Sequence, residues 1–317
     1  MNNVLLSICI PTYNRAEYLK ITLNSIVSQK MFFENDIVEI IVSDNCSSDN
    51  TKEVVDVFVK TFGNKIRYYR NNENIKDANF ETVLSYGKGQ FLKLNNDTLA
   101  HRNNTLDIII DSIEKNIVKR NILFFSNGVL NYNDTIILND LNSFVKTVSY
   151  YSTWIGGFGI WKDDFDLIDE FSRNSNLQLV QVDVLLRIIS KGSCVFVNDF
   201  VMFDSHNPSN KGGYNIFEVF IQNYLNLLYQ HIGEDQIEMT TYKAEKKKLL
   251  NEFVFSWFCK IFIDKGENYT FETKKFNLYM IRYFNFIDIF KFYLNVLKYR
   301  RSKIKIKSVV KNIFVQD

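Results

Sequence analysis

The first hundred residues alternate between continuous apolar runs and polar loops. Four apolar runs predict strands, at residues 5–10, 37–43, 66–70 and 91–94. Continuous apolar runs, unlike alternating ones, are typical of strands that are covered on both faces of a sheet. The stretches between them repeat apolar residues at helical spacing, at residues 15–29, 51–62 and 77–87. Strands that alternate with helices predict βαβ units, and therefore an α/β fold with a mostly parallel sheet.

Two asparagines stand where helix caps are expected. Asn14 precedes the first predicted helix and Asn50 precedes the second. An asparagine side chain in this position accepts a hydrogen bond from the free amide groups of the first turn. Glu53 follows Asn50 by three residues, which completes the pattern of a capping box. We therefore predict that Asn14 and Asn50 cap these two helices.

After residue 100 the pattern predicts a more irregular arrangement. Helices are expected over 104–118 and 177–190, with strands at 122–125 and within 194–203. From residue 215 onward nearly every segment has helical periodicity. This change to all-helical sequence is the domain boundary that we predict.

Each predicted strand of the first hundred residues runs into a polar loop. These loops are Pro11–Asn14, Asp44–Asp49, Asn71–Asn74 and Asn95–Asp97. Parallel strands place their carboxyl ends at one edge of the sheet, and open α/β sheets bind their ligands there. We therefore expect the loops to converge on one crevice, with Asp97 as the strongest candidate for holding a cation.

Composition and charge add an asymmetry to this picture. The chain has 317 residues, 46% apolar and 23% charged, which is ordinary for a globular protein of one or two domains. Its net charge is only +2, but residues 274–311 hold eight lysines and three arginines against the single acid Asp288. That segment carries +10, which leaves −8 for the rest. A basic tail on a mildly acidic body indicates contact with an anionic surface.

The cysteines and the targeting patterns of the sequence indicate the cellular compartment of the protein. Four cysteines are widely spaced and contain no C-x-x-C pair, which predicts reduced thiols rather than a disulfide framework or a zinc site. We find no pattern of a signal peptide and no apolar run long enough for a transmembrane helix. These features predict a cytoplasmic location.

Three of the segments above carry a resemblance when they are taken in order. Ile10–Arg15 reads I-P-T-Y-N-R, Ile40–Asp49 reads I-I-V-S-D-N-C-S-S-D, and Phe91–Asp97 reads F-L-K-L-N-N-D. This order and spacing resembles the inverting GT-A glycosyltransferases of family 2, and most of all the bacterial members that build capsular or O-antigen polysaccharide. The resemblance covers residues 4–100 well and continues weakly to about residue 215.

The resemblance implies a fold, substrates and a cofactor. It implies a GT-A catalytic domain over residues 1–214, with a nucleotide-binding half (1–100) and an acceptor half (101–214), followed by a helical region (215–317). It further implies a nucleotide-sugar donor, a divalent cation (Mg²⁺ or Mn²⁺), and a glycan or lipid-linked acceptor.

The family's motifs also fall on individual positions of this chain. The resemblance implies that the nucleotide sugar is bound by Pro11, Thr12, Tyr13, Asn14, Arg15, Asp44, Asn45, Asn79, Asn95 and Asn96. Asp44 or Asn45 would read the base. The D-x-D metal motif falls on Asn95–Asp97, where the first aspartate is replaced by Asn95. An asparagine can bond a ribose hydroxyl but adds no charge to a metal site, so Asp97 is the expected metal ligand.

A base and additional ligands are expected in the second half of the catalytic domain. Asp183 lies where the family commonly carries an acidic residue on a helix that faces the acceptor, and we predict it as the catalytic base. The alternative is an ion pair between Asp183 and Arg187, four residues later. Asp163 and Asp164 are rival candidates for the base.

The polar loop from Asp204 to Tyr214 is a second predicted site. His206 is expected to be a metal ligand and Lys211 a cation for the diphosphate, in a loop that hinges at Gly212–Gly213. The alternative is a flexible surface loop with an incidental histidine. The remaining histidines, His101 and His231, are predicted to be surface residues.

The sequence therefore predicts an inverting sugar transferase that acts from the cytoplasmic side on a cell-envelope glycan. Residues 274–311 are expected either to contact the inner face of the membrane or to pack their aromatic residues on the catalytic domain. A nucleic-acid partner is not expected, because no recognition motif accompanies the charge.

Other function classes were weighed against this one. A sugar nucleotidyltransferase should carry a glycine-rich loop after the first strand, where this chain has Pro11–Asn14. A dehydrogenase should carry a G-x-G-x-x-G motif after a strand, and none is found. A degenerate transferase that binds without turnover is the third alternative, since two asparagines stand in the metal motif.

Overall fold

The computed structural model describes residues 4–208, 211–233, 236–265 and 269–314, with side chains as far as Lys303. The chain forms two compact units, residues 1–208 and 209–317. Each unit is described by itself. The sequence had predicted the change of domain slightly later, after residue 214.

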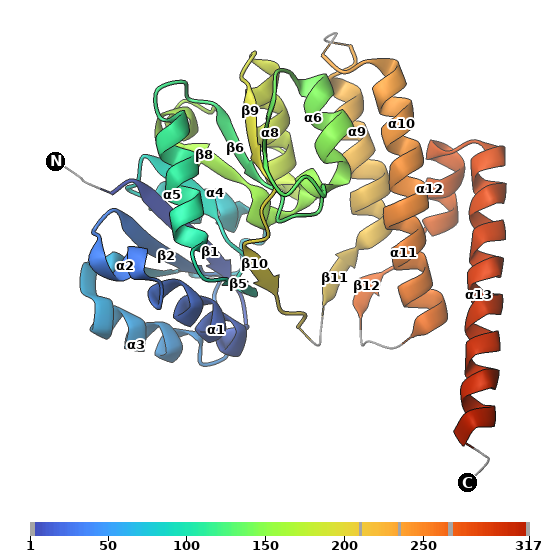
Figure 1. The fold of residues 1–317 in the computed structure, drawn as a ribbon, viewed down its shortest axis with the longest axis horizontal. Coiled ribbons are helices and arrows are strands. Elements are labelled where there is room, and N and C mark those ends of the chain that lie inside the picture. The colour runs from blue at the N-terminus through green and yellow to red at the C-terminus, as the bar shows by residue number, and fades with distance from the viewer. Residues whose placement is uncertain (1–3, 209–210, 234–235, 266–268, 315–317) are drawn as a thin grey trace. The chain divides into compact units, whose positions relative to one another are not determined.

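The first unit is built on a five-stranded sheet with the order β3-β2-β1-β4-β8 (Figure 1). Its strands are β1 (Leu6–Thr12), β2 (Val38–Asp44), β3 (Ile66–Arg70), β4 (Phe91–Leu94) and β8 (Gly159–Trp161). The first four strands run parallel to one another, and β8 is antiparallel to β4. The mostly parallel sheet predicted from the apolar runs is therefore confirmed.

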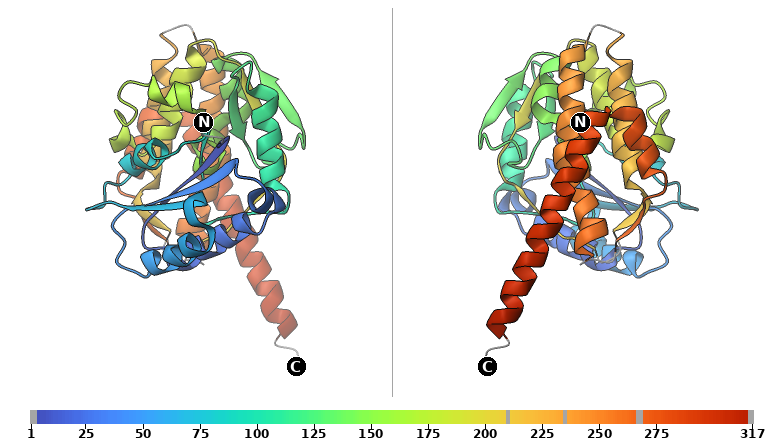
Figure 2. Two further views of the ribbon diagram at one scale, coloured as in Figure 1. Left: turned by 90° about the vertical axis from the view of Figure 1, so that its left-hand side faces the viewer. Right: turned by 90° about the vertical axis from the view of Figure 1, so that its right-hand side faces the viewer.

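Helices cover both faces of this sheet, which explains why its central strands β1, β2 and β4 are almost entirely buried and mostly apolar. Residues at alternate positions, such as Ile8 and Ile40, share a core with α1 (Ala16–Val27), α3 (Thr51–Phe62) and α5 (Thr105–Asn116). The opposite face is covered by α4 (Ala78–Ser85), which contacts β1, β2 and β4. Figure 2 shows α1 and α3 together on one side of the strands.

A second, smaller sheet follows in the first unit. It has the order β6-β9-β7, and β5 and β10 form a separate antiparallel pair. The strands are β5 (Leu99–His101), β6 (Ile122–Phe125), β7 (Thr135–Leu138), β9 (Val195–Asn198) and β10 (Phe203–Ser205). The remaining helices are α2 (Lys30–Glu34), α6 (Leu141–Val148), α7 (Lys162–Asp166) and α8 (Val180–Ser190).

One carboxylate begins both helices that were expected to have asparagine caps. Asp49 accepts hydrogen bonds from the backbone amide of Ala16 at 3.0 Å and from that of Thr51 at 3.1 Å, so it caps α1 and α3 together. Burial opposes its ionisation, but a hydrogen bond from the Thr51 hydroxyl, together with these amide bonds, outweighs burial and lowers the pKa of Asp49. The predicted cap Asn14 is wrong, because Arg15 occupies the N-cap position of α1. Asn50 occupies the N-cap position of α3 as predicted, but its side chain makes no capping bond.

The second unit is largely helical, as the sequence predicts. Its helices are α9 (Tyr224–Gln230), α10 (Met239–Leu249), α11 (Phe255–Phe258), α12 (Phe276–Tyr283) and α13 (Phe286–Phe314), with π-helical turns between several of them. A short strand pair, β11 (Gly212–Asn215) and β12 (Thr270–Glu272), accompanies them. Figure 2 shows α13 along the outside of this unit. Within the described residues, we find no helix with the length and apolar character that a membrane crossing requires.

Candidate functional site

The loops that follow β1, β2 and β4 meet at the carboxyl edge of the main sheet, as predicted. The loop after β1 is bonded to the loop after β2, because the Asn45 amide donates to the Thr12 carbonyl at 2.9 Å and the Asn14 amide donates to the Ser47 hydroxyl at 2.9 Å. It is also bonded to the loop after β4, since the Thr12 hydroxyl donates to Oδ2 of Asp97 at 2.9 Å. Segments more than thirty and eighty residues apart in the sequence therefore share one polar surface.

Asp97 is the centre of this surface. Its side chain is 3% exposed. It accepts a hydrogen bond from the Thr12 hydroxyl and forms an ion pair with the Arg15 guanidinium at 3.0 Å. The Thr22 hydroxyl holds its backbone carbonyl at 2.9 Å. Burial raises the pKa of Asp97, while Arg15, Thr12 and the Tyr13 amide act in the opposite direction. Asp97 is therefore a buried carboxylate at this edge whose two oxygens are held by Thr12 and Arg15, and its role as a metal ligand stays a prediction.

The two asparagines before Asp97 face different surroundings. Asn95 is completely buried, and its Oδ1 lies 2.9 Å from Nε2 of His101, so its amide points into the protein and not toward a ligand. Asn96, by contrast, has a buried Oδ1 that has no hydrogen-bond partner among the described residues. The sequence prediction that both asparagines contact the nucleotide sugar therefore fits Asn96 better than Asn95.

His101 corrects a sequence prediction. We expected a surface residue, but its side chain is buried, bonded to Asn95, and packed edge-on against Phe203. Burial lowers the pKa of His101 well below its usual range, and the nearby Lys93 acts in the same direction. His101 thus supports the Asn95–Asp97 loop from behind as a neutral side chain. His231 is also buried, with its Nδ1 at 3.0 Å from Oε1 of Gln236, so its prediction as a surface residue is wrong too.

The donor set around Asp97 fits a hard divalent cation that is shared with a ligand. Among the described residues, no group of three or more histidine, cysteine or acidic side chains could enclose a metal. The chain would supply the Asp97 carboxylate and the unpartnered amide oxygen of Asn96. Mg²⁺ and Mn²⁺ accept such oxygen ligands, and Mg²⁺ commonly takes its remaining ligands from substrate phosphates and water.

His206 lies beside this loop in the first unit. Its backbone amide donates to the carbonyl of Thr98 at 2.9 Å, one residue after Asp97, and its side chain is partly exposed. Lys211 belongs to the second unit, where its ammonium group lies 5.3 Å from the ring centre of Trp257. The neighbouring Gly212–Gly213 pair lies in β11, where we had expected a hinge. The roles of His206 and Lys211 stay predictions.

The residues expected to read the base are held in a network. Asp44 is fully buried and accepts hydrogen bonds from the Tyr68 hydroxyl at 2.6 Å and from the Ser47 amide at 2.8 Å. Burial, followed by this bond to Asp44, raises the pKa of Tyr68. Asn45 donates to Asn74 at 2.8 Å, which holds the next loop in place. Asp44 and Asn45 therefore shape the edge of the sheet, and their contact with a base stays a prediction.

Other predicted ligands differ in exposure at this edge. Asn79 is buried and exchanges hydrogen bonds with Ser43 on β2, at 2.6 and 3.0 Å, so it supports the strand end. Tyr13 is 45% exposed, and Pro11 is partly exposed. The backbone amide of Tyr13 interacts with Asp97, and its half-exposed aromatic ring offers a surface on which a planar base can stack.

Asp183 lies in a buried ion-pair cluster. Arg173 donates to both of its oxygens, at 2.9 and 3.1 Å, Asn174 donates at 3.0 Å, and Arg187 lies 3.0 Å away. Both carboxylate oxygens are therefore occupied by groups of the protein. This arrangement favours the ion-pair alternative that the sequence left open, although Arg173 takes part as well as Arg187.

The rival bases lie at the wrong edge of the sheet. Trp161 pairs with Phe91 at the start of β4, so the following residues lie near the amino ends of the parallel strands. Asp163 forms an exposed ion pair with Arg120 at 3.0 Å. Burial raises the pKa of Asp164. Neither carboxylate is at the edge where the polar loops converge.

Lys93 is a buried residue that sequence reasoning missed. It lies on β4 with no exposed surface, and its ammonium group donates to the carbonyls of Gly156 at 2.7 Å and Leu94 at 3.1 Å. The rings of Phe125 and Phe203 lie over it, with centres at 5.2 and 4.8 Å. Burial lowers the pKa of Lys93 to about 7. The sequence signal that could have identified Lys93 is a single lysine within a strand predicted to be covered on both faces.

A family model accounts for a little less than half of the chain, the part that holds these loops. Residues 7–156 match the model of Glycosyl transferase family 2. This segment is a family 2 glycosyltransferase domain. It contains β1, β2, β4 and the converging loops, and it ends at Gly156, the residue that Lys93 holds.

Curated relatives match shorter segments of the family 2 domain. Abequosyltransferase RfbV of Salmonella typhimurium is 45% identical over 89 residues, 28% of this chain and 26% of its own length. Chondroitin synthase of Escherichia coli is 41% identical over 68 residues, 22% of this chain and 9% of its own. The matches thus span about a quarter or less of these relatives.

Solved structures resemble the chain over a greater length. Staphylococcus aureus TarS 1–349 in complex with UDP-GlcNAc superimposes with a TM-score of 0.55 and 18% identity over 87% of this chain and 76% of that one. The mannosyltransferase PcManGT from Pyrobaculum calidifontis, in complex with GDP-Man and Mn²⁺, superimposes with a TM-score of 0.52 and 13% identity, over 82% of this chain and 81% of that one. At these identities the likeness shows the fold, and the predicted GT-A fold is confirmed.

Proposed function

We propose that this protein transfers a glycosyl group, with inversion, from a nucleotide-sugar donor to a glycan or lipid-linked acceptor in surface polysaccharide biosynthesis. The observation that carries the proposal is that three strand-end loops of a family 2 domain meet at one edge, where the loop after β1 bonds both the buried carboxylate of Asp97 and the loop after β2. Solved proteins of this fold hold UDP-GlcNAc or GDP-Man. The names of two relatives, chondroitin synthase and poly(ribitol-phosphate) β-N-acetylglucosaminyltransferase, support a polymeric acceptor.

The chain's own groups supply the charge that a departing nucleoside diphosphate requires. Arg15 is held at Asp97 with 38% of its side chain exposed, so its guanidinium is positioned for the diphosphate. Thr12 fixes the second oxygen of Asp97 and thus keeps that carboxylate in one orientation. A divalent cation bound at Asp97 would stabilise the same developing charge. The exposed ring of Tyr13 would stack on the base.

A screen of nucleotide sugars tests the donor. In the presence of Mn²⁺, the cognate donor at about 100 times its dissociation constant should stabilise the folded chain by about 2.7 kcal/mol. We expect a clear rise in the melting temperature with one donor and little change with the others, measured by differential scanning fluorimetry. The Tyr13→Ala variant should lose this shift, whereas Tyr132→Ala, which removes a similarly exposed tyrosine far along the sequence, should keep it. No shift with any donor would contradict the proposal, and a shift without turnover would favour a degenerate binding protein.

A substitution of Asp183 distinguishes a purely structural role of this residue from a role as the catalytic base. Asp183→Asn removes one partner of a buried cluster with Arg173 and Arg187, and we expect it to lower the free energy of unfolding by about 2 kcal/mol, since Arg173 is partly exposed. As the proposed base, Asp183 would in addition be required for turnover of the folded fraction. Urea unfolding and turnover by the same preparation distinguish the cases. A folded variant that keeps its turnover number would limit Asp183 to structure.

The basic C-terminal segment supports a proposal for where the enzyme is located. We propose that residues 274–311 bring the chain to the inner face of the cell membrane, where a lipid-linked acceptor would be present. Their charge of +10 supports contact with anionic lipids.

A further inference from the structure

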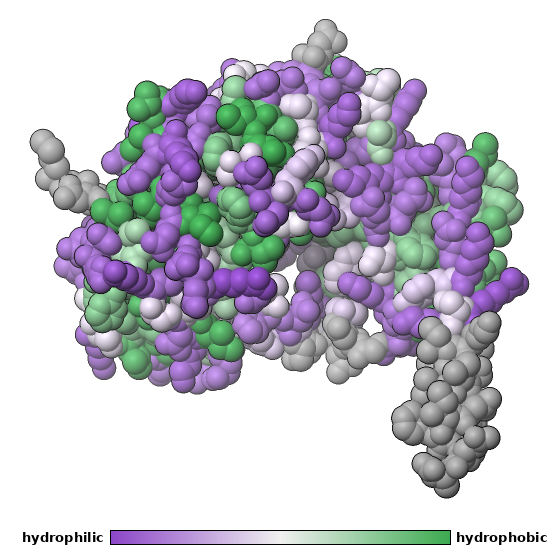
Figure 3. All heavy atoms as spheres, in the orientation of Figure 1, coloured by the Kyte–Doolittle hydropathy of each residue, from purple (hydrophilic) through white to green (hydrophobic). Residues whose placement is uncertain are grey.

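The outer face of α13 carries a stripe of exposed apolar side chains. The exposed fractions of five of them range from 40% for Leu294 to 81% for Phe286, and the five are Phe286, Ile287, Phe290, Leu294 and Leu297. These positions recur at helical spacing, so they share one face. The opposite face is buried in the unit through Phe292 and Val296. Figure 3 shows apolar side chains along the edge of the second unit where α13 lies.

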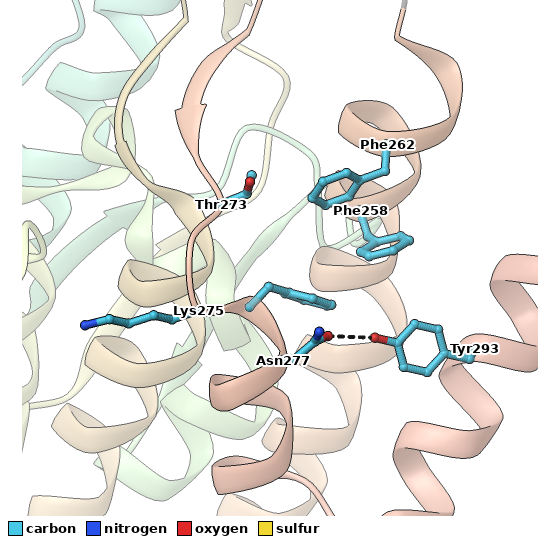
Figure 4. A pocket seen from close by; sticks show the side chains of 7 residues that line it. Phe258, Phe262, Thr273, Lys275, Asn277 and Tyr293 are labelled. Carbon is cyan, nitrogen blue, oxygen red and sulfur yellow. Dashed lines mark hydrogen bonds between the residues drawn. The ribbon is translucent and has the colours of Figure 1, made fainter.

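An aromatic pocket of the second unit includes a residue of α13. It has a volume of about 480 Å³ and is lined by Phe258, Phe262, Phe276 and Tyr293, with Thr273, Lys275 and Asn277 around them. Tyr293 lies on α13 beside the stripe, and its hydroxyl donates to Asn277 at 3.1 Å. Figure 4 shows the rings of Phe258 and Phe262 turned toward the pocket while the Lys275 side chain extends away from it. Helix α13 therefore contributes one residue, Tyr293, to an aromatic recess of the second unit.

Exposed cations border the stripe on both sides. Lys291 and Lys298 are seven residues apart and lie along one edge of it, while Arg300 lies along the other. All three side chains are exposed, and Asp288 is the single acidic residue between 286 and 303 in the sequence. An apolar face flanked by lysine and arginine is the pattern of a helix that lies in a membrane interface.

We propose that α13 docks the second unit on an anionic lipid bilayer. The stripe enters the boundary between headgroups and acyl chains, and the flanking cations meet anionic headgroups. A second copy of this chain is a poorer occupant, because a two-fold pairing of the stripe would bring each copy's cations against those of the other. This inference deepens the proposed function, since it assigns the surface through which the transferase reaches a lipid-linked acceptor.

Vesicle binding by the full chain tests the proposal. We expect co-sedimentation with vesicles of phosphatidylcholine mixed with phosphatidylglycerol, and little with phosphatidylcholine alone. Phe290→Ser combined with Leu294→Ser should weaken binding about tenfold or more. Lys298→Gln combined with Arg300→Gln should weaken it about fivefold per cation, and added salt should do the same. Phe33→Ser is the matched control, because Phe33 is 72% exposed on α2 in the first unit, and its loss should leave binding unchanged.

Three results would overturn the proposal. Equal binding to both kinds of vesicle, or binding unaffected by the two double variants, would exclude α13 as the docking surface. A dimer in sedimentation velocity that dissociates in the Phe290→Ser, Leu294→Ser variant would assign the stripe to a second copy. If the Phe290→Ser, Leu294→Ser variant fails to fold, vesicle binding by the Lys298→Gln, Arg300→Gln variant and the salt dependence of binding still test the proposal. The donor-induced melting shift is measured on the same protein without lipid, so failure of vesicle docking is distinguished from failure of the transferase proposal.

Discussion

Replacing Asp97 with asparagine is expected to lower the rate of glycosyl transfer by a factor on the order of 10²–10³. Asparagine has the same shape and still accepts the Thr12 hydroxyl, so the loop should keep its conformation. It lacks the charge that positions Arg15 at 3.0 Å and that would attract a divalent cation. The Mn²⁺-dependent part of donor binding should therefore disappear together with turnover, while the melting temperature changes by only a few degrees.

A surface carboxylate provides the control for this variant. Asp111 forms an exposed ion pair with Lys115 at 2.7 Å on α5, and Asp111→Asn should leave both turnover and donor binding unchanged. Turnover and Mn²⁺ titrations of donor binding, made on both variants, give the comparison. An Asp97→Asn protein that transfers sugar at the parent rate would remove Asp97 from the mechanism, and with it the reason to place the donor at this edge of the sheet.

The architecture of the first unit follows from periodicity because its strands and helices are defined by their own residues. Three of the four residues in the run 91–94 are apolar, and all four residues of β4 are buried. The positions of the strand-end loops follow in turn, since parallel strands leave no other edge for them. For these reasons the convergence around Asp97 could be predicted before any coordinate was known.

The interactions that fix the loops depend on contacts distant in the sequence. Asp49 caps α1 across a separation of 33 residues, and local cap rules select the nearer Asn14 instead. Asn14 is unavailable to α1, because its carbonyl oxygen accepts the Ser48 amide at 2.7 Å. Tertiary packing, which no local pattern contains, decides between such candidates.

The partners of buried polar residues are the second feature that could not be predicted from the sequence. His101 and His231 were predicted at the surface, yet both are buried with a partner. Asp183 shows the opposite case, since its apolar surroundings correctly indicate burial. The sequence did not reveal that Arg173, ten residues earlier, occupies both of its oxygens. Burial can be deduced from neighbours in sequence, but the partners cannot.

Lys93 should make the stability of the first unit depend on pH. Its pKa is lowered to about 7 by burial, whereas an unfolded lysine titrates near 10.4. The folded state therefore loses its proton first as pH rises, so the cost of the buried charge is fully present below pH 7 and is relieved between about pH 7 and 10. Between about pH 6 and 9.5 this residue should add about 3 kcal/mol to the free energy of unfolding.

The Lys93→Met variant isolates this contribution. It should lack that part of the pH dependence and should lower activity as well, because the carbonyl of Gly156 loses the group that holds it 2.7 Å from β4. Lys115→Met, which alters an exposed lysine, should follow the parent at every pH. Urea unfolding of the three proteins at both ends of the pH range measures the difference. Parallel curves for the parent and Lys93→Met would mean that Lys93 keeps an ordinary pKa, which requires water or an anion beside its ammonium group. The buried contacts with Phe125 and Phe203 argue against that, since they surround the ammonium with aromatic carbon.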